Sequence, residues 1–113
     1  MQNKLIYVSA PFTKGDQLQN VRDACLAGDK LIELGYHPYV PHCTALWHCI
    51  SPKTFNQWIQ IDSVLLARCD AVLRLPGESV GADIEIELAK RLNIPVYYGI
   101  EELEQDVQSL VGV

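Results

Sequence analysis

Short apolar runs of strand length alternate along this chain with longer segments whose apolar residues recur every three or four positions. We expect strands at residues 4–9, 37–41, 70–75 and 95–98, and helices at residues 16–34, 54–69, 80–92 and 101–110. Strands that alternate with helices predict βαβ units, in which right-handed crossovers join a parallel sheet. The sequence therefore predicts an α/β fold, a flavodoxin-like three-layer sandwich whose parallel sheet has four to five strands in the order 2-1-3-4(-5). We expect a single domain over residues 1–113.

The chain is acidic, with 9 Lys and Arg residues against 14 Asp and Glu residues and a net charge of −5. It has no basic run that could follow a phosphate backbone, so we expect no nucleic acid polymer as a partner. The apolar run before Pro11 is too short to span a bilayer and lacks a signal-peptide cleavage pattern. We therefore expect a cytoplasmic protein without a membrane partner.

Residues 42–53, after the second predicted strand, are rich in His, Cys and Ser, and we expect a loop there. The pairs His42-Cys43 and His48-Cys49 bring potential metal ligands into this segment. Adjacent residues seldom reach one ion together, and no CxxC or HxxxH spacing is present, so we expect no metal. Because the chain is long enough to form a core without disulfides, we expect four free thiols, at Cys25, Cys43, Cys49 and Cys69.

Ligands of open α/β sheets bind beyond the carboxyl ends of the strands, at the point where the strand order reverses. This rule places a site between the loop after the first strand and the loop after the third strand. The substrate-binding candidates in these two loops are Ser9, Pro11, Phe12, Gly77, Ser79 and Gly81. The second loop opens a helix, where free backbone N–H groups and the Ser79 hydroxyl favour an anion such as phosphate. A helix cap formed by Ser79 or Gly81 is an alternative that is compatible with this role.

Two carboxylates follow in the same helix, and about 200° separates Glu85 from Glu87 around its axis at roughly 100° per residue. In this interpretation Ile84 and Leu88 mark the packed side, Glu85 lies beside them near the helix opening, and Glu87 faces solvent. Glu85 is thus placed as a nucleophile or an acid/base group. A first-turn glutamate that only interacts favourably with the helix dipole is the alternative.

Asp62 lies on the apolar stripe of the preceding helix, between Trp58 and Leu66. Carboxylates seldom point inwards without a partner, so Asp62 is either functional or hydrogen-bonded to the backbone at the edge of the core. Tyr7 lies in the carboxyl half of the first strand, where active sites form, although core tyrosines are common. Trp47 and Trp58 could stack on a base or pack in the core.

Together these stretches resemble the nucleoside 2-deoxyribosyltransferase family, in particular its short branch of bacterial and phage domains. The resemblance rests on Ile6-Tyr7-Val8-Ser9-Ala10-Pro11, Asn20 with Ala24 and Leu31, Gly35-Tyr36, Trp58 to Asp62, Cys69-Asp70-Ala71, Leu75-Pro76-Gly77 and Ser79-Val80-Gly81-Ala82-Asp83-Ile84-Glu85. The last segment is the most specific, since the family places its catalytic glutamate four residues after the glycine of a D/S-x-G-x-x-x-E segment.

The resemblance implies that Glu85 attacks C1′ of a 2′-deoxynucleoside or its 5′-monophosphate, that Tyr7 orients Glu85, and that Asp62 binds or protonates the departing base. Ser79 stands where related 2′-deoxynucleoside 5′-phosphate N-hydrolases carry a serine that meets the phosphate, and where transferases carry an aspartate. Such cleavage or transfer proceeds through a covalent glycosyl-Glu85 intermediate and needs no cofactor. The resemblance also implies a homodimer or higher homo-oligomer whose subunits complete one another's pockets.

Two other functions stay open from the sequence. Ribonucleoside-monophosphate phosphoribohydrolases of the cytokinin-activating type also carry Pro-Gly, then Gly and Glu, at the opening of a helix. The segment Gly77-Glu78-Ser79 departs from their P-G-G-x-G-T-x-x-E pattern. The other alternative is a non-catalytic nucleotide-binding module in which Glu85 is only a helix-end charge.

Overall fold

A parallel sheet occupies the centre of the molecule. The computed structural model describes residues 4–111, and the side chains of residues 4–106. The strands are β1 (Leu5–Ser9), β2 (His37–Tyr39), β3 (Ala71–Arg74) and β4 (Val96–Tyr97), in the order β2-β1-β3-β4. All neighbouring strands are parallel, with Tyr7 opposite Val72 and Ser9 opposite Arg74. The predicted order 2-1-3-4 is confirmed, and the sheet within the described residues has no fifth strand.

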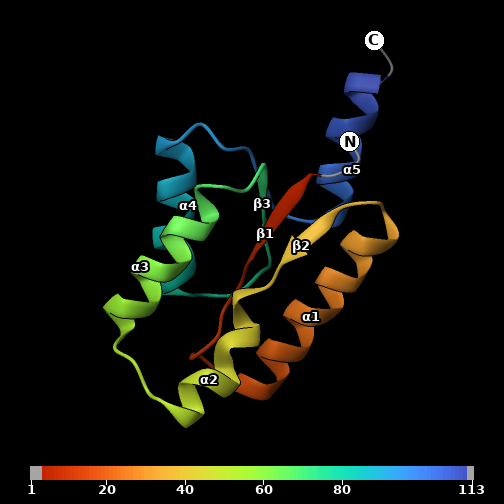
Figure 1. Cartoon of the computed structure of the whole chain (residues 1–113). Coiled ribbons are helices and arrows are strands. Elements are labelled where there is room, and N and C mark those ends of the chain that lie inside the picture. Colours follow the sequence, from red (N-terminus) through yellow and green to blue (C-terminus); the bar gives the residue numbers. More distant parts are fainter. Residues whose placement is uncertain (1–3, 112–113) are drawn as a thin grey trace.

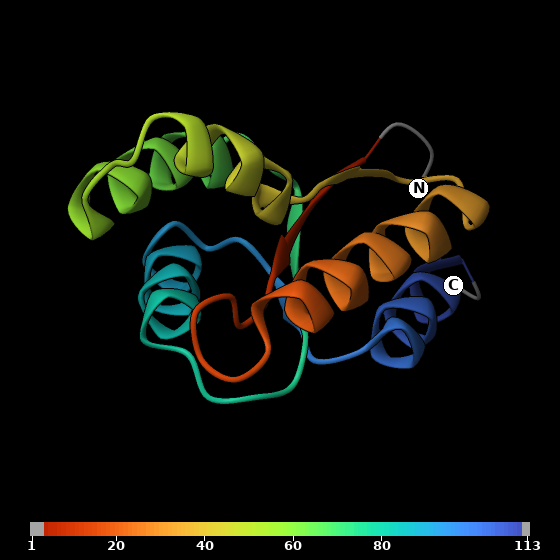
Figure 2. The ribbon, with the colours of Figure 1, turned by 90° about the horizontal axis from the view of Figure 1, so that it is seen from below.

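Two layers of helices cover the sheet, because side chains alternate between the faces of each strand. From β1, Ile6 and Val8 point towards α1 (Gln17–Glu33) and α5 (Ile100–Val111). Tyr7 and Ser9 point the other way, towards α3 (Phe55–Leu66) and α4 (Val80–Arg91). Figures 1 and 2 show the two layers on opposite sides of the sheet, which confirms the three-layer α/β architecture.

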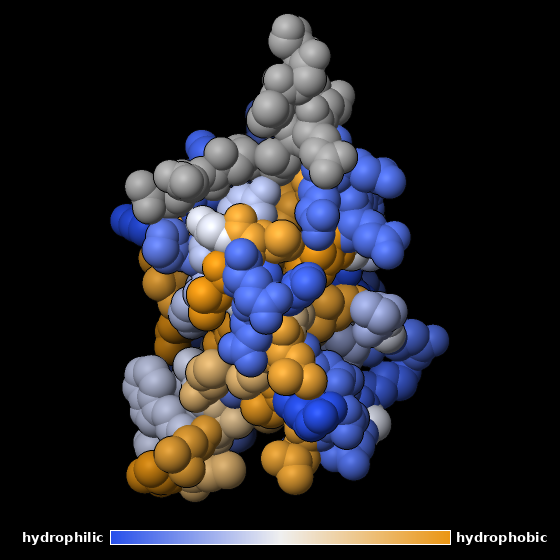
Figure 3. Space-filling view, turned by 90° about the vertical axis from the view of Figure 1, so that its right-hand side faces the viewer, coloured by the Kyte–Doolittle hydropathy of each residue, from blue (hydrophilic) through white to orange (hydrophobic). Residues whose placement is uncertain are grey.

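Each layer has its own apolar core. On the α1 side the core comprises Ile6, Val8, Ala24, Leu31, Tyr36, Ala71, Leu73, Tyr97 and Leu103. On the α4 side it comprises Tyr7, Leu66, Cys69, Val72, Ile86 and Ala89. The outer side of α1 mixes polar and apolar side chains (Figure 3), as expected of a surface helix.

Polar side chains fix where the helices begin. The Asp16 carboxylate accepts a hydrogen bond from the Gln19 backbone N–H, and Thr54 forms a reciprocal capping box with Gln57. The Ser79 hydroxyl accepts a hydrogen bond from the Ala82 backbone N–H at 3.1 Å. The cap that the sequence offered as an alternative for Ser79 is therefore present, and it fixes the start of α4 beside the candidate site.

Residues 41–50 differ from the prediction. Instead of a loop, they form a short 3-10 helix η1 (Pro41–Thr44) followed by α2 (Ala45–Ile50). Pro41 opens the first of these helices, a position where its missing N–H costs nothing. No residue of α2 is buried, and Leu46, Trp47 and Ile50 are 70%, 50% and 76% exposed. The helix therefore has no buried apolar stripe that periodicity could detect.

The four cysteines are free thiols, as expected, with Cys69 buried and Cys43 and Cys49 exposed. In the part of the chain that the structure describes, none of the helices has the length and apolar character needed to cross a membrane.

Candidate active site

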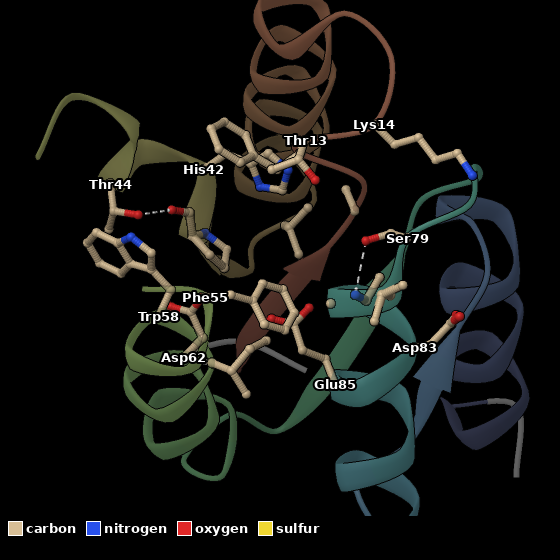
Figure 4. Close-up of a pocket in the computed structure, with 18 of the residues that line it drawn as sticks. Thr13, Lys14, His42, Thr44, Phe55, Trp58, Asp62, Ser79, Asp83 and Glu85 are labelled. Atoms are coloured by element: carbon tan, nitrogen blue, oxygen red, sulfur yellow. Dashed lines mark hydrogen bonds between the residues drawn. The ribbon is translucent and has the colours of Figure 1, made fainter. Parts of the chain in front are cut away.

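A pocket of about 870 Å³ opens at the carboxyl ends of β1 and β3, where the strand order reverses. Its walls come from the loop after β1, from η1 and α2, and from the first turns of α3 and α4 (Figure 4). This volume lies in the range of pockets that enclose small molecules of nucleotide size. The predicted position of the site and the observed pocket coincide.

Glu85 lies at the floor of this pocket, with 7% of its surface exposed. The Tyr7 hydroxyl donates a hydrogen bond to one carboxylate oxygen of Glu85, Oε2. The Ser9 hydroxyl donates to the other, Oε1, at 2.8 Å. Both donors come from alternate positions of β1, so they share the face of the sheet that α4 covers. The carboxylate is therefore held in one orientation by two hydroxyl groups.

The two glutamates of α4 are separated as the spacing predicts, since Glu85 is buried and Glu87 is exposed. The prediction that Ile84 and Leu88 mark the packed side of this helix was wrong in detail. Ile86 and Ala89 are buried in the core, whereas Ile84 and Leu88 are only partly buried. The face of α4 that meets the sheet therefore includes Glu85, which contacts Tyr7 and Ser9.

Burial raises the pKa of Glu85 to about 7, although the hydrogen bonds from Tyr7 and Ser9 act in the opposite direction. Burial also raises the pKa of Tyr7 well above its usual value. The phenol therefore keeps its proton and acts as a donor at neutral pH. Glu85 changes its charge near neutral pH, which is the behaviour expected of a group that reacts or exchanges a proton.

Asp62 of α3 also faces the pocket (Figure 4). Its Oδ1 atom is buried and has no hydrogen-bond partner among the described residues. Burial raises the pKa of this carboxyl group to about 6. The alternative predicted from the sequence was a hydrogen bond from Asp62 to the backbone at the edge of the core. The Oδ1 atom forms no such bond with the described residues.

His42 is a pocket residue that the sequence analysis considered only as a loop residue and as a potential metal ligand. The ring is 7% exposed, and its Nε2 atom lies 2.7 Å from the carbonyl oxygen of Pro11. Because a carbonyl only accepts, Nε2 carries the proton and Nδ1 is an acceptor. Within the described side chains, His42 Nδ1 and Asp62 Oδ1 are the two buried polar atoms without a partner. Such atoms are rare in folded proteins, and both belong to residues that line this pocket.

Aromatic rings form the wall next to Asp62. Trp58 and Phe55 of α3 line the pocket, and Trp58 Nε1 donates to His48 Nδ1 at 2.8 Å. The ring of Trp47 stands perpendicular to that of Trp58, with 5.3 Å between centroids, and the Lys53 ammonium group lies 4.8 Å from the Trp47 ring. Neither tryptophan belongs to the two core clusters, so the core-packing alternative is wrong for both.

The opposite wall is the turn that leads into α4. Gly77, Ser79 and Gly81 line the pocket as the sequence predicts. Gly77 has a φ of +116°, and a Cβ atom there would lie 2.7 Å from Cγ of Pro11, so only glycine allows the two loops to meet this closely. Lys14 and Glu78 form an ion pair between the same two loops.

The remaining predicted residues fall into two groups. Phe12 lines the pocket, while Tyr7, Ser9 and Pro11 lie behind its surface. Tyr7 and Ser9 act there through Glu85, and Pro11 acts through its contacts with His42 and Gly77. The pocket residues that sequence reasoning missed include His42, His48, Lys53 and Arg74. Of these, Arg74 could have been found, because strand alternation places it on the same face as Tyr7 and Ser9.

No group of three or more His, Cys, Asp or Glu side chains that could hold a metal ion occurs among the described residues. The neighbouring pairs at positions 42–43 and 48–49 do not come together as one ligand set. His42 instead contacts Pro11, and His48 contacts Trp58.

A family model for a domain of unknown function, DUF7768, matches residues 4–99. The chain belongs to this family. No curated protein matches the chain. The matched range includes β1 to β4 and every residue of the site described above. The family description gives no activity, so the chemistry must be argued from the pocket itself.

The raised pKa of Glu85 predicts how stability depends on pH. Folding favours the protonated form, so this stabilisation is present below the pKa of the unfolded chain and is lost as the pH rises through about 7. We expect the free energy of unfolding of Glu85→Gln, relative to wild type, to increase by about 3 kcal/mol between about pH 4.5 and pH 8. Urea denaturation at several pH values measures this. Glu87→Gln, on the exposed side of the same helix, is the matched control, and parallel curves for wild type and Glu85→Gln would contradict the prediction.

Proposed function

We propose that this protein is an N-glycosidase that cleaves or transfers at the N-glycosidic bond of 2′-deoxynucleosides or their 5′-monophosphates, with Glu85 as the nucleophile. The observation that carries the proposal is the buried Glu85 carboxylate, held by Tyr7 and Ser9 at the floor of a nucleotide-sized pocket. The motifs that resemble nucleoside 2-deoxyribosyltransferases supply the same three residues and support this choice.

The proposed reaction has two displacements. The Glu85 carboxylate attacks C1′, the bond from C1′ to the base nitrogen breaks, and the bonding electrons leave with the base. Asp62, whose pKa of about 6 allows it to carry a proton near neutral pH, donates that proton to the departing base. Water or a second base then attacks C1′ from the side that the first base left, and the bond from C1′ to Glu85 breaks. The Asp62 carboxylate takes the proton of the incoming group, and the sugar keeps its configuration.

The two walls suit the two ends of a deoxynucleotide. The N-terminus of α4 offers free N–H groups and the Ser79 hydroxyl, which favour a 5′-phosphate. Trp58 and Phe55 offer flat apolar surfaces to a base. Glu85 lies between these walls (Figure 4), so the proposal puts the sugar next to its carboxylate.

The experiment that tests the function is incubation of the protein with a panel of deoxynucleosides and their 5′-monophosphates, followed by chromatography for free base. Matching ribonucleotides belong in the same panel. Release from ribonucleotides alone would favour a phosphoribohydrolase. Stabilisation by ligands without any release would favour a nucleotide-binding module.

We expect Glu85→Ala to abolish base release and Glu87→Ala to keep most of it, because only Glu85 faces the pocket. Loss of the nucleophile typically lowers turnover by several orders of magnitude. Rates are measured by chromatography, with circular dichroism to show that both variants are folded. Equal losses in two folded variants would remove Glu85 from the role of nucleophile.

A second prediction concerns the phosphate. If Ser79 and the amides near Gly81 hold it, a deoxynucleoside monophosphate should bind about tenfold or more tightly than its nucleoside, since a charge-assisted hydrogen bond contributes roughly 1.5–3 kcal/mol. Ser79→Asp should reverse this order through charge repulsion, while its carboxylate can still cap α4. Competition assays measure the order. A wild-type preference for the free nucleoside would indicate a base-exchange transferase instead.

We also propose that copies of this chain associate, because the pocket is open to solvent on one side and a second subunit could complete it. Apolar side chains near its mouth are exposed, among them Phe55 at 53% and Val80 at 72%. Sedimentation at assay concentration should show at least a dimer. A fully active monomer would contradict this.

A further inference from the structure

The His42 ring lies in the wall of the pocket and is held there by the loop after β1. His42 belongs to η1, lines the pocket (Figure 4) and is 7% exposed. Its Nε2 atom lies 2.7 Å from the carbonyl oxygen of Pro11, a residue behind the pocket surface. The Phe12 ring stands nearly perpendicular to the imidazole, with 5.7 Å between centroids. Two consecutive residues of this loop thus fix the orientation of the ring.

The contact with Pro11 decides which nitrogen of His42 carries the proton. A backbone carbonyl only accepts, so the proton of the neutral imidazole lies on Nε2 and Nδ1 keeps a free lone pair. Burial lowers the pKa of His42, which keeps the ring neutral at neutral pH. His42 therefore offers the pocket an acceptor and no second donor.

This acceptor is left without a partner by the chain itself. His42 Nδ1 is buried and forms no hydrogen bond with the described residues. The nearby Thr44 hydroxyl does not supply one, because it donates to the carbonyl oxygen of Pro41 at 2.7 Å. Buried polar atoms in folded proteins nearly always have a partner. A donor from a molecule in the pocket would complete the hydrogen bonding of this ring.

His48 presents the opposite chemistry in the same pocket. Its Nδ1 atom accepts the Trp58 indole N–H at 2.8 Å and the Lys53 backbone N–H at 3.2 Å. Because two donors occupy Nδ1, the proton of the neutral ring lies on Nε2, and His48 adds a donor to the pocket wall. The two histidines are therefore held in opposite tautomers by their neighbours. A ligand that satisfies both carries a donor and an acceptor.

The depth of His42 Nδ1 selects the kind of donor that reaches it. Because this atom lies beneath the pocket surface, the donor has to project from the ring system that carries it. The exocyclic amino group of a base projects in this way. The ring N–H of an oxo base instead lies beside a carbonyl oxygen, a second acceptor that the lone pair of Nδ1 would repel. Amino bases also have ring nitrogens or carbonyl oxygens that accept from His48.

We propose that His42 is a specificity-determining residue whose Nδ1 atom accepts a hydrogen bond from the exocyclic amino group of the substrate base. This inference rests on the proposed function and names its substrate class, 2′-deoxynucleosides or their 5′-monophosphates whose base carries an amino group. His42 contacts the base and takes no part in the bond changes at C1′.

Binding of matched pairs of deoxynucleoside monophosphates tests this role. The bases of each pair differ by an amino group: cytosine against uracil, adenine against hypoxanthine, and guanine against hypoxanthine. Calorimetry with Glu85→Gln, which cannot form the glycosyl intermediate, gives dissociation constants without cleavage. In the pair that fits the pocket, the amino member should bind about tenfold more tightly or better, since a buried acceptor left unpaired is costly.

Two further substitutions in the same background separate base recognition from the contact with Pro11. In His42→Gln the amide nitrogen takes the place of Nε2 and keeps the bond to Pro11, but no acceptor remains at the place of Nδ1. In His42→Asn the side-chain oxygen takes the place of Nδ1, and the bond to Pro11 is lost. The amino preference should vanish in His42→Gln and persist in His42→Asn. His37→Gln, at an exposed histidine of β2, is the matched control.

A second measurement needs no substitution at His42. NMR of the labelled histidine ring nitrogens should show the Nδ1 signal of His42 shifting when an amino nucleotide saturates the pocket. This signal also decides the case in which both His42 variants lose the preference or fail to fold. A shift then supports the proposal, and an unchanged signal overturns it.

Three binding results would overturn the role of His42. One is equal affinity within every pair, and another is the failure of all these nucleotides to bind. The third is an amino preference that survives in His42→Gln, which would mean that the ring only holds Pro11.

Base release by the wild-type protein separates this proposal from the glycosidase function. Amino-dependent binding without base release from any substrate would contradict only the glycosidase function. Base release that does not depend on the amino group would contradict only the role of His42.

Discussion

The hydrogen bonds from Tyr7 and Ser9 to Glu85 are the interaction on which the rest of the site depends. A carboxylate with 7% exposure loses most of its hydration, which is costly unless donors replace the water. Two hydroxyl groups do so here, one for each oxygen. They can act together because they lie two residues apart on a central strand, with α4 packed across the same face. The strand order thus determines the chemistry at the pocket floor.

Around this fixed carboxylate, two loops and a short helical segment carry different kinds of side chains. The turn before α4 carries backbone N–H groups and the Ser79 hydroxyl, and Arg74 holds that turn through the carbonyls of Leu75 and Gly77. The segment η1–α2 and the start of α3 carry imidazole and indole rings. Because Glu85 lies between them, a ligand with a charged end and an aromatic end would place its centre over the carboxylate.

Periodicity was sufficient to predict the sheet order, the location of the pocket and the separation of Glu85 from Glu87. These features depend on the fixed repeats of strands and helices and on the rule that parallel strands end at one edge. The helix at residues 45–50 was missed because it buries no residue and so has no apolar stripe. The role of His42 was missed because its partner, the carbonyl of Pro11, belongs to a loop whose path no local pattern specifies. Arg74 was overlooked although strand alternation places it on the face of Tyr7 and Ser9.

Two buried polar atoms without a partner among the described side chains indicate the kind of ligand that suits the pocket. Because a buried acceptor left unpaired costs about 1–3 kcal/mol, His42 Nδ1 and Asp62 Oδ1 favour a ligand that forms hydrogen bonds with them. The Pro11 carbonyl holds the proton of His42 on Nε2, so the ring offers only an acceptor to the pocket. Asp62, with a pKa of about 6, can present a donor when it is protonated. A heterocyclic base carries amino donors and ring-nitrogen acceptors along one edge, whereas a phosphate dianion has acceptors only. Under the proposed function, the two unpaired atoms suit a base, and the N-terminus of α4 suits the phosphate.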